Sequence, residues 1–125
     1  MVILDTSVIV DHIRQPGKRS SLDEIFEKYP NENFGISTIT IQELYQGKST
    51  REKEKEEILL GAISSFITLP YIYDTARLAG EISRDAPTPI AFADAAIAAT
   101  AILNSASLLT LNKKDFEKIE NLALL

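Results

Sequence analysis

The sequence contains no cysteine, so it can form neither a disulfide bond nor a thiolate metal site. It has a single histidine, His12, and a lone histidine in a helix is more often structural or exposed than catalytic. No serine stands in a nucleophile elbow, and no glycine-rich phosphate loop occurs. Ser-His-Asp catalysis and phosphate binding by such a loop are therefore unsupported, and the lack of cysteine fits a reducing, cytoplasmic compartment.

Long hydrophobic runs are also absent. No stretch of about 18 apolar residues occurs, so we expect no membrane-spanning helix. No basic segment precedes an apolar stretch near Met1, so we expect no secretory signal. The 125 residues are 45% hydrophobic and 25% charged, which is ordinary for a soluble globular protein. This length predicts one domain spanning residues 1–125.

The net charge is −5 at pH 7, which disfavours a simple basic surface for nucleic acid. This argument weakens if acidic residues form a metal site. Two divalent cations add four positive charges and would bring −5 to −1. Proteins that act on phosphates through metal ions need not be basic overall.

Short apolar runs alternate with helix-like segments along the chain, which predicts an α/β fold with a mainly parallel sheet. The longest helix is expected over Thr50–Ile67, where opposite charges recur at helical spacing. An alanine-rich helix is expected over Ile90–Leu103. The expected strands are Val2–Leu4, Phe34–Ser37, Thr68–Leu69, Ser107–Thr110 and Leu122–Leu125.

Four acidic residues stand out by position. Asp5 ends the first apolar strand, Asp115 follows the strand near residue 109, and Glu43 follows the strand near residue 36 by one helical turn. Asp94 is the only charge between Asp85 and Lys113 and lies in the alanine-rich helix, where acids are almost never buried without a partner. In open α/β sheets, ligands bind at the carboxyl ends of the strands. We therefore expect the four acids to meet there.

Each acid also has a structural explanation. Asp5 could be an N-cap residue that the helix dipole favours. Glu43 could form a capping box with Thr40, in which its carboxylate bonds the N-cap amide. Asp94 could lie on an exposed polar stripe or make a structural hydrogen bond, and Asp115 could be a solvated turn residue. The joint pattern is stronger evidence than any one of these residues.

Four segments in order resemble the PIN-domain family of metal-dependent ribonucleases, and within it the small VapC-type toxins of toxin–antitoxin pairs. The similarity covers essentially the whole chain. The segments are Ile3-Leu4-Asp5-Thr6-Ser7, Ser37-Thr38-Ile39-Thr40-Ile41-Gln42-Glu43-Leu44, Asp94-Ala95-Ala96-Ile97-Ala98-Ala99 and Leu109-Thr110-Leu111-Asn112-Lys113-Lys114-Asp115-Phe116.

The resemblance implies a three-layer α/β/α fold around a mainly parallel sheet of four to five strands. It also implies a catalytic, metal-binding set of acids that falls on Asp5, Glu43, Asp94 and Asp115. Among these the fourth position is the most variable. Thr6 and Thr110 match hydroxyl positions that help to orient the acids and the attacking water, and Asn112 stands where some relatives carry another acid.

The resemblance further implies Mg²⁺ or Mn²⁺, RNA as substrate, a homodimer and a small antitoxin that blocks the site. Hard divalent cations prefer carboxylate oxygens and water, which agrees with this residue set. The resulting prediction is a cytoplasmic metal-dependent endoribonuclease, the toxin of a toxin–antitoxin pair. The alternatives are a housekeeping PIN nuclease in RNA processing or decay, and a catalytically silent PIN module that binds RNA or protein.

Overall fold

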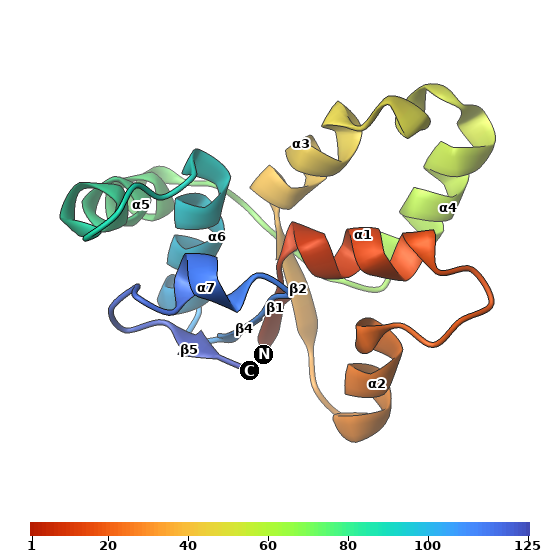
Figure 1. Ribbon diagram of the computed structural model, residues 1–125, viewed down its shortest axis with the longest axis horizontal. Helices are drawn as coiled ribbons and strands as arrows, with labels where there is room; N and C mark the ends of the chain where they lie inside the picture. Colours follow the sequence, from red (N-terminus) through yellow and green to blue (C-terminus); the bar gives the residue numbers. More distant parts are fainter.

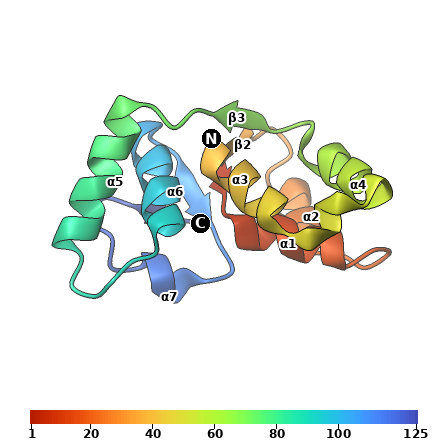
Figure 2. The ribbon, with the colours of Figure 1, turned by 90° about the horizontal axis from the view of Figure 1, so that it is seen from above.

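A computed structural model describes residues 1–125 as one five-stranded sheet with helices on both faces (Figures 1 and 2). No helix is both long and apolar enough to cross a bilayer. The elements in chain order are β1 (Val2–Leu4), α1 (Thr6–Arg14), α2 (Ser21–Lys28), β2 (Phe34–Ser37), α3 (Thr38–Gln46), the 3₁₀ helix η1 (Lys48–Arg51), α4 (Lys53–Ile63), β3 (Ile67–Leu69), α5 (Tyr73–Asp85), α6 (Phe92–Leu103), β4 (Ser107–Leu109), α7 (Lys113–Phe116) and β5 (Ala123–Leu124).

All strand pairings in the sheet are parallel, and the strand order is β3-β2-β1-β4-β5. The predicted α/β/α fold with four to five strands is therefore confirmed. The chain extends the sheet from β1 through β2 to β3 and then returns to the other side of β1 to add β4 and β5. The order reverses between β1 and β4, which makes the carboxyl ends of these two strands the topological switch point, where ligands bind in such sheets.

Strand β1 is central because it is apolar on both faces. Val2 and Leu4 pack into one core with α1, α2, α3 and α4, whereas Ile3 packs into another with α6 and α7. Alternate residues of a strand point to opposite faces, so three consecutive buried residues anchor both layers at once. Figure 2 shows α5 and α6 on one side of the sheet and α1 to α4 on the other.

The alanine-rich α6 packs tightly because its side chains are small. Its residues Ala95 to Ala101 are all buried, against the sheet on one side and α5 on the other. Alanine combines a high helix propensity with a short side chain, so the backbone of α6 can approach its neighbours closely. This packing holds the first turn of α6 at the carboxyl edge of the sheet.

The helix predicted over Thr50–Ile67 is confirmed only over Lys53–Ile63, and it is not the longest, because α5 has 13 residues. The chain forms η1, then α4 to Ile63, and then turns so that Ile67 pairs with Gly35 of β2. The charge pattern predicted a continuous helix, but Ile67 instead pairs with β2 and begins the short edge strand β3. A Cβ at Gly35 would lie 3.2 Å from the carbonyl oxygen of Ile67, so this close approach favours glycine.

His12 has the structural role that its solitary position suggests. Its Nδ1 lies 2.7 Å from the Ser20 hydroxyl, which joins α1 to the start of α2. Ser20 and Asp23 form a capping box at this helix start, with both reciprocal bonds present. The hydrogen bonds from the Ser20 amide and hydroxyl hold the pKa of Asp23 below its usual value.

Candidate active site at the carboxyl edge of the sheet

Asp5 lies directly after β1 and is 4% exposed. Its backbone amide donates to the carbonyl of Leu109 (2.9 Å), which extends the pairing of β1 with β4 by one residue. The hydroxyls of Ser7 (2.6 Å) and Thr110 (2.8 Å) both donate to its Oδ2 atom. Asp5 is the N-cap residue of α1, as the structural explanation expected, but its side chain accepts no hydrogen bond from a helix amide. No hydrogen bond reaches its Oδ1 atom. One oxygen of a fixed carboxylate is therefore left for a ligand.

Glu43 lies on α3, and its Oε1 accepts a 2.6 Å hydrogen bond from the hydroxyl of Thr6. The capping-box explanation is wrong, because α3 begins at Thr38 and its N-cap is Ser37, whose hydroxyl accepts from the amide of Ile39. Thr40 is buried inside the helix, with its hydroxyl 3.3 Å from that of Thr6. Glu43 is thus oriented by a residue of α1, directly after Asp5.

Asp94 lies half-buried in the first turn of α6. Burial raises the pKa of its carboxyl group to about 6, and the negative charges of Asp5, Asp115 and Glu43 raise it in the same direction, in that order of strength. Three residues that are distant in the sequence therefore act electrostatically on this one carboxyl group. The four carboxyl groups are therefore near enough to interact electrostatically.

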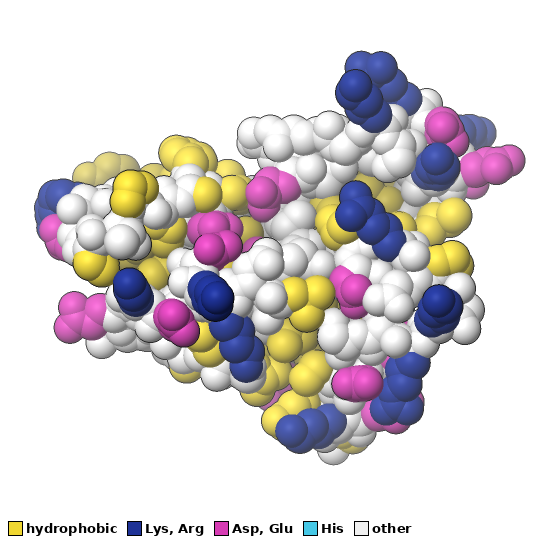
Figure 3. Space-filling model, in the orientation of Figure 1, with side chains coloured by type: hydrophobic (Ala, Val, Ile, Leu, Met, Phe, Trp, Pro, Cys, Tyr) yellow, Lys and Arg dark blue, Asp and Glu magenta, His cyan; other side chains and the backbone are white.

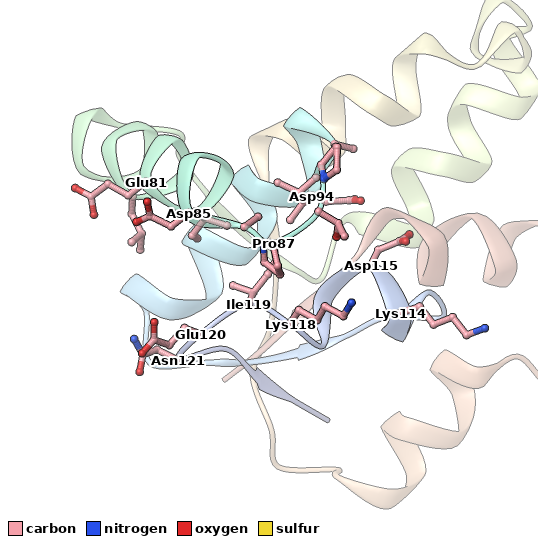
Figure 4. A pocket seen from close by; sticks show the side chains of 17 residues that line it. Glu81, Asp85, Pro87, Asp94, Lys114, Asp115, Lys118, Ile119, Glu120 and Asn121 are labelled. Carbon is pink, nitrogen blue, oxygen red and sulfur yellow. The ribbon is translucent and has the colours of Figure 1, made fainter.

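Asp115 is exposed on α7 and lines a pocket of about 500 Å³ together with Asp94. Figure 4 shows both carboxylates at the same end of this pocket. Asn112, the residue before α7, donates its backbone amide to the Thr110 hydroxyl (3.0 Å), while its exposed side chain makes no hydrogen bond. Asn112 therefore supports Thr110 through its backbone.

Ser7 is a further residue at this edge that the sequence did not single out as functional. Its hydroxyl donates to Asp5 and accepts from the backbone amide of Leu111 (3.2 Å). It thereby joins the start of α1 to the loop after β4. The available signal was a hydroxyl residue two positions after an acid, but the same residue is equally typical of a helix start.

The four carboxylates form a site rich in negative charge. None of them forms an ion pair with a lysine, arginine or histidine. Figure 3 shows acidic side chains in the central part of this face, between α3, α6 and α7. Carboxylates that crowd without a cation repel one another, and a divalent cation at the same place would reverse the effect on their pKa values.

The donor set suits a hard cation such as Mg²⁺ with some of its waters retained. No three acidic or histidine side chains lie close enough together to hold one metal ion. Mg²⁺ is usually held by only one or two carboxylates, with water completing its octahedral shell. The free Oδ1 of Asp5 and the half-buried carboxylate of Asp94 fit that arrangement.

Comparisons with known proteins agree on one family. The PIN domain family model matches residues 2–122. Ribonuclease VapC1 of Rickettsia felis is 33% identical over 133 residues, covering 99% of this chain and 94% of the relative. VapBC2 of Rickettsia felis, solved bound to a promoter DNA fragment, superposes with a TM-score of 0.87 at 26% identity, covering 100% of this chain and 98% of that one.

Two further structures have the same fold over nearly their whole length. DNA-bound VapBC from Salmonella typhimurium gives a TM-score of 0.86 at 25% identity, covering 99% and 96% of the two chains. The FitAcB structure from Neisseria gonorrhoeae gives 0.80 at 26% identity, covering 100% and 96%. The family match over residues 2–122 and the shared fold agree with the arrangement of acids at the switch point, and the chain belongs to the PIN-domain family.

Proposed function

We propose that this protein is a metal-dependent endoribonuclease and the toxin of a toxin–antitoxin pair. The observation that carries the proposal is geometric: Asp5 follows β1, the adjacent Thr6 bonds Glu43, and Asp94 and Asp115 line one pocket. Burial and the charges of the other three acids also raise the pKa of Asp94. Perturbed carboxylates that gather at the switch point of an α/β sheet are typical of a catalytic metal site. The 33% identity to a ribonuclease favours RNA as substrate.

The proposed site residues have different roles. Asp5 and Asp94 would hold the cation, Asp5 through Oδ1 because two hydroxyls occupy Oδ2. Glu43 would bind a metal ion directly or orient the attacking water, and Asp115 would complete a second metal position. A bound divalent cation supplies Lewis-acid stabilisation of the phosphate and makes a nucleophilic hydroxide available near neutral pH. Thr6 and Thr110 keep two of these carboxylates in fixed orientations.

The proposed reaction is hydrolysis of an RNA phosphodiester. The water oxygen bonds to phosphorus, the bond from phosphorus to the 3′-oxygen breaks, and that oxygen takes the electron pair and then a proton. Glu43 is positioned to receive the proton that the water loses, because Thr6 fixes its carboxylate at the site. The products are a 5′-phosphate and a 3′-hydroxyl.

The test is cleavage of total RNA by the purified protein in Mg²⁺, Mn²⁺ or EDTA, followed by mapping of the new ends. We expect metal-stimulated cleavage that disappears in an Asp94→Asn variant. Cleavage that is equal in EDTA, or that persists in this variant, would contradict the proposal. Absence of cleavage with retained RNA or protein binding would favour the alternative of a silent binding module.

Metal binding itself can be measured without RNA. A ligand that binds only the native state stabilises it by about 2.7 kcal/mol at a hundredfold excess over its dissociation constant. We expect millimolar Mg²⁺ or Mn²⁺ to raise the melting temperature, and Asp5→Asn or Asp94→Asn to remove most of that rise. An unchanged melting temperature together with no heat of binding would mean that the carboxylates form no shared metal site.

A cognate antitoxin is the proposed protein partner, because the similar VapBC structures are toxin–antitoxin complexes. A short neighbouring reading frame for a DNA-binding protein would support this role. Co-expression of the two chains should then give a stable complex in which RNA cleavage is suppressed. A gene without such a neighbour, and a protein that cleaves ribosomal or messenger precursors at defined sites, would favour a housekeeping nuclease.

A further inference from the structure

The pocket beside the acids extends well beyond the place where the chemistry would occur. Its volume of about 500 Å³ lies within the range of small-molecule sites. One wall is the carboxyl-terminal half of α5, another is the loop over residues 86–91, and the third is α7 with the turn that follows it. Asp94 and Asp115 lie at one end, and Glu120 and Asn121 lie at the other (Figure 4). A ligand longer than one phosphate can therefore enter.

The middle of the pocket combines an unpaired cation with apolar walls. Lys118 lines the pocket and forms no ion pair with any carboxylate. Pro87, Pro89, Ile90 and Ile119 line the same space. The same lining carries five acidic residues, so the contact for an anionic ligand falls on Lys118, whose charge no carboxylate of the protein neutralises. Apolar side chains around it are suited to the face of a flat, uncharged group.

The far end of the pocket is rich in hydrogen-bond acceptors. The carboxylate of Glu120 forms neither a hydrogen bond nor an ion pair within the protein, and Asn121 adds an amide. Ionised carboxylates only accept hydrogen bonds, so they favour a partner that presents N–H donors. The amino groups of cytosine, adenine and guanine are such donors. Uracil presents a single N–H on its edge, between two carbonyl oxygens that repel a carboxylate, so it is the least suited of the four bases.

We propose that this pocket binds one nucleotide of single-stranded RNA next to the cleaved phosphodiester. Its phosphate would contact Lys118, its base would pack on the proline and isoleucine side chains, and the base edge would reach Glu120. Single-stranded RNA is commonly read in this way, through bases turned out of the stack and bonded on their edges. The inference rests on the proposed ribonuclease function and makes the pocket the determinant of base preference at one position beside the cut.

The first test is direct binding of nucleoside monophosphates in EDTA, followed by the backbone amide signals of the ¹⁵N-labelled protein. Addition of CMP, AMP or GMP should shift the signals of residues 86–91 and 117–121, and UMP should bind more weakly. Lys118→Ala should weaken binding about tenfold, as expected when a charged hydrogen bond is lost. Lys18→Ala removes the same charge from the loop between α1 and α2 and should leave the affinity unchanged.

The second test uses RNA of random sequence with metal present. Lys118→Ala should raise KM with little change in kcat and should reduce the slope of log affinity against log salt by about 0.7. Glu120→Gln replaces a carboxylate that only accepts with an amide that both donates and accepts, so it should relax the discrimination against uridine at one position beside the cut. A structural role alone for these exposed residues would move neither the salt slope nor the base preference.

The outcomes separate this inference from the proposed function. Nucleotide-induced shifts in the pocket without any RNA cleavage would support the pocket and contradict the nuclease. Metal-dependent cleavage with no shifts in the pocket, and with base preference unchanged in Glu120→Gln, would support the nuclease and overturn the pocket. Equal binding of all four monophosphates would overturn the role of Glu120 in base selection.

Discussion

The hydroxyl of Thr110 donates a 2.8 Å hydrogen bond to Oδ2 of Asp5, which joins the ends of β4 and β1 at the switch point. Both residues are buried, so water cannot readily replace the bond if it is lost. The bond directs the free Oδ1 oxygen of Asp5, which is the atom proposed to meet the cation. Thr110 is therefore a positioning residue in the proposed mechanism.

We expect Thr110→Val to lower kcat/KM and metal affinity by about 10- to 100-fold, as is typical when a partner of a metal ligand is removed. Thr110→Ser keeps the hydroxyl and should keep most of the activity. Thr100→Val is a matched control, because Thr100 is also buried but its hydroxyl donates to the carbonyl of Ala96 within α6. Activity of Thr110→Val equal to that of Thr100→Val would exclude the positioning role.

Glu43 can now be tested without the capping-box ambiguity. Glu43→Gln removes a negative charge near Asp94, so the free energy of unfolding of the metal-free protein should stay constant or increase. RNA cleavage should fall by about 10²-fold or more, as when a positioned catalytic group is lost. Chemical denaturation and steady-state cleavage, measured on the same preparation, check the two expectations.

The control for Glu43→Gln is the true cap of the same helix. Ser37→Ala removes the hydroxyl that accepts from the amide of Ile39, and it should cost about 1 kcal/mol of stability while cleavage is largely kept. The two variants should therefore change stability and activity in opposite ways. Wild-type cleavage by Glu43→Gln at saturating metal would remove Glu43 from the site.

Much of this site followed from the sequence because its signals are local. Asp5 and Asp115 follow apolar strands, and Asp94 is the only charge in a long apolar segment. Parallel strands bring their carboxyl ends to one edge, so positions along the chain translate directly into a shared location. The same logic predicted every strand of the sheet to within a residue or two.

The parts that were missed depend on choices between equivalent residues. Ser37, Thr38 and Thr40 are all competent caps, and only the end of β2 decides that Ser37 takes this role. The family resemblance gave Thr6 an orienting role but not its partner. Thr6 bonds Glu43 across 37 positions, and this contact depends on how α1 packs beside α3. Local patterns contain no information on such long-range contacts.

The contribution of Asp94 to the stability of the metal-free protein should decrease as the pH rises from about 4 to 6. Its pKa is about 6 when folded against 3.8 as the ordinary value, so the native state binds this proton more tightly than the unfolded state. The stabilisation is complete below the ordinary pKa and is lost as the pH passes the folded pKa. Metal binding requires the ionised carboxylate and should weaken below pH 6.

The pH effect is best measured as a difference between wild type and Asp94→Asn in EDTA, because Asp23 has a lowered pKa and contributes with the opposite sign. The variant should be the more stable protein at pH 7.5. Its advantage over the wild type should shrink as the pH falls towards 4. A difference in stability that is constant with pH would mean that the pKa of Asp94 is not raised.

The homodimer that the family resemblance implies remains a prediction. Besides the family resemblance, the sequence favours a homodimer because aromatic residues are enriched in interfaces, and five aromatic or large apolar residues exceed the needs of so small a core: Tyr45, Phe66, Ile67, Tyr71 and Tyr73. In the structure Phe66 is buried and Tyr71 is half-buried, so these two mainly serve the fold. The others remain exposed.

Tyr73 on α5 is 80% exposed and Phe92 at the start of α6 is 74% exposed. The ring centroid of Phe92 lies 6.4 Å from that of the half-buried Tyr71. Aromatic side chains are enriched in protein interfaces, and exposed apolar clusters commonly mark them.

We expect light scattering at micromolar concentration to give twice the mass of one chain. The double variant Tyr73→Ser, Phe92→Ser should be monomeric with an unchanged circular dichroism spectrum. Ile58→Ser, which alters an apolar side chain on α4 that is 58% exposed, should remain dimeric. A monomeric wild-type protein would exclude the dimer, and a dimeric double variant would place its interface on another surface.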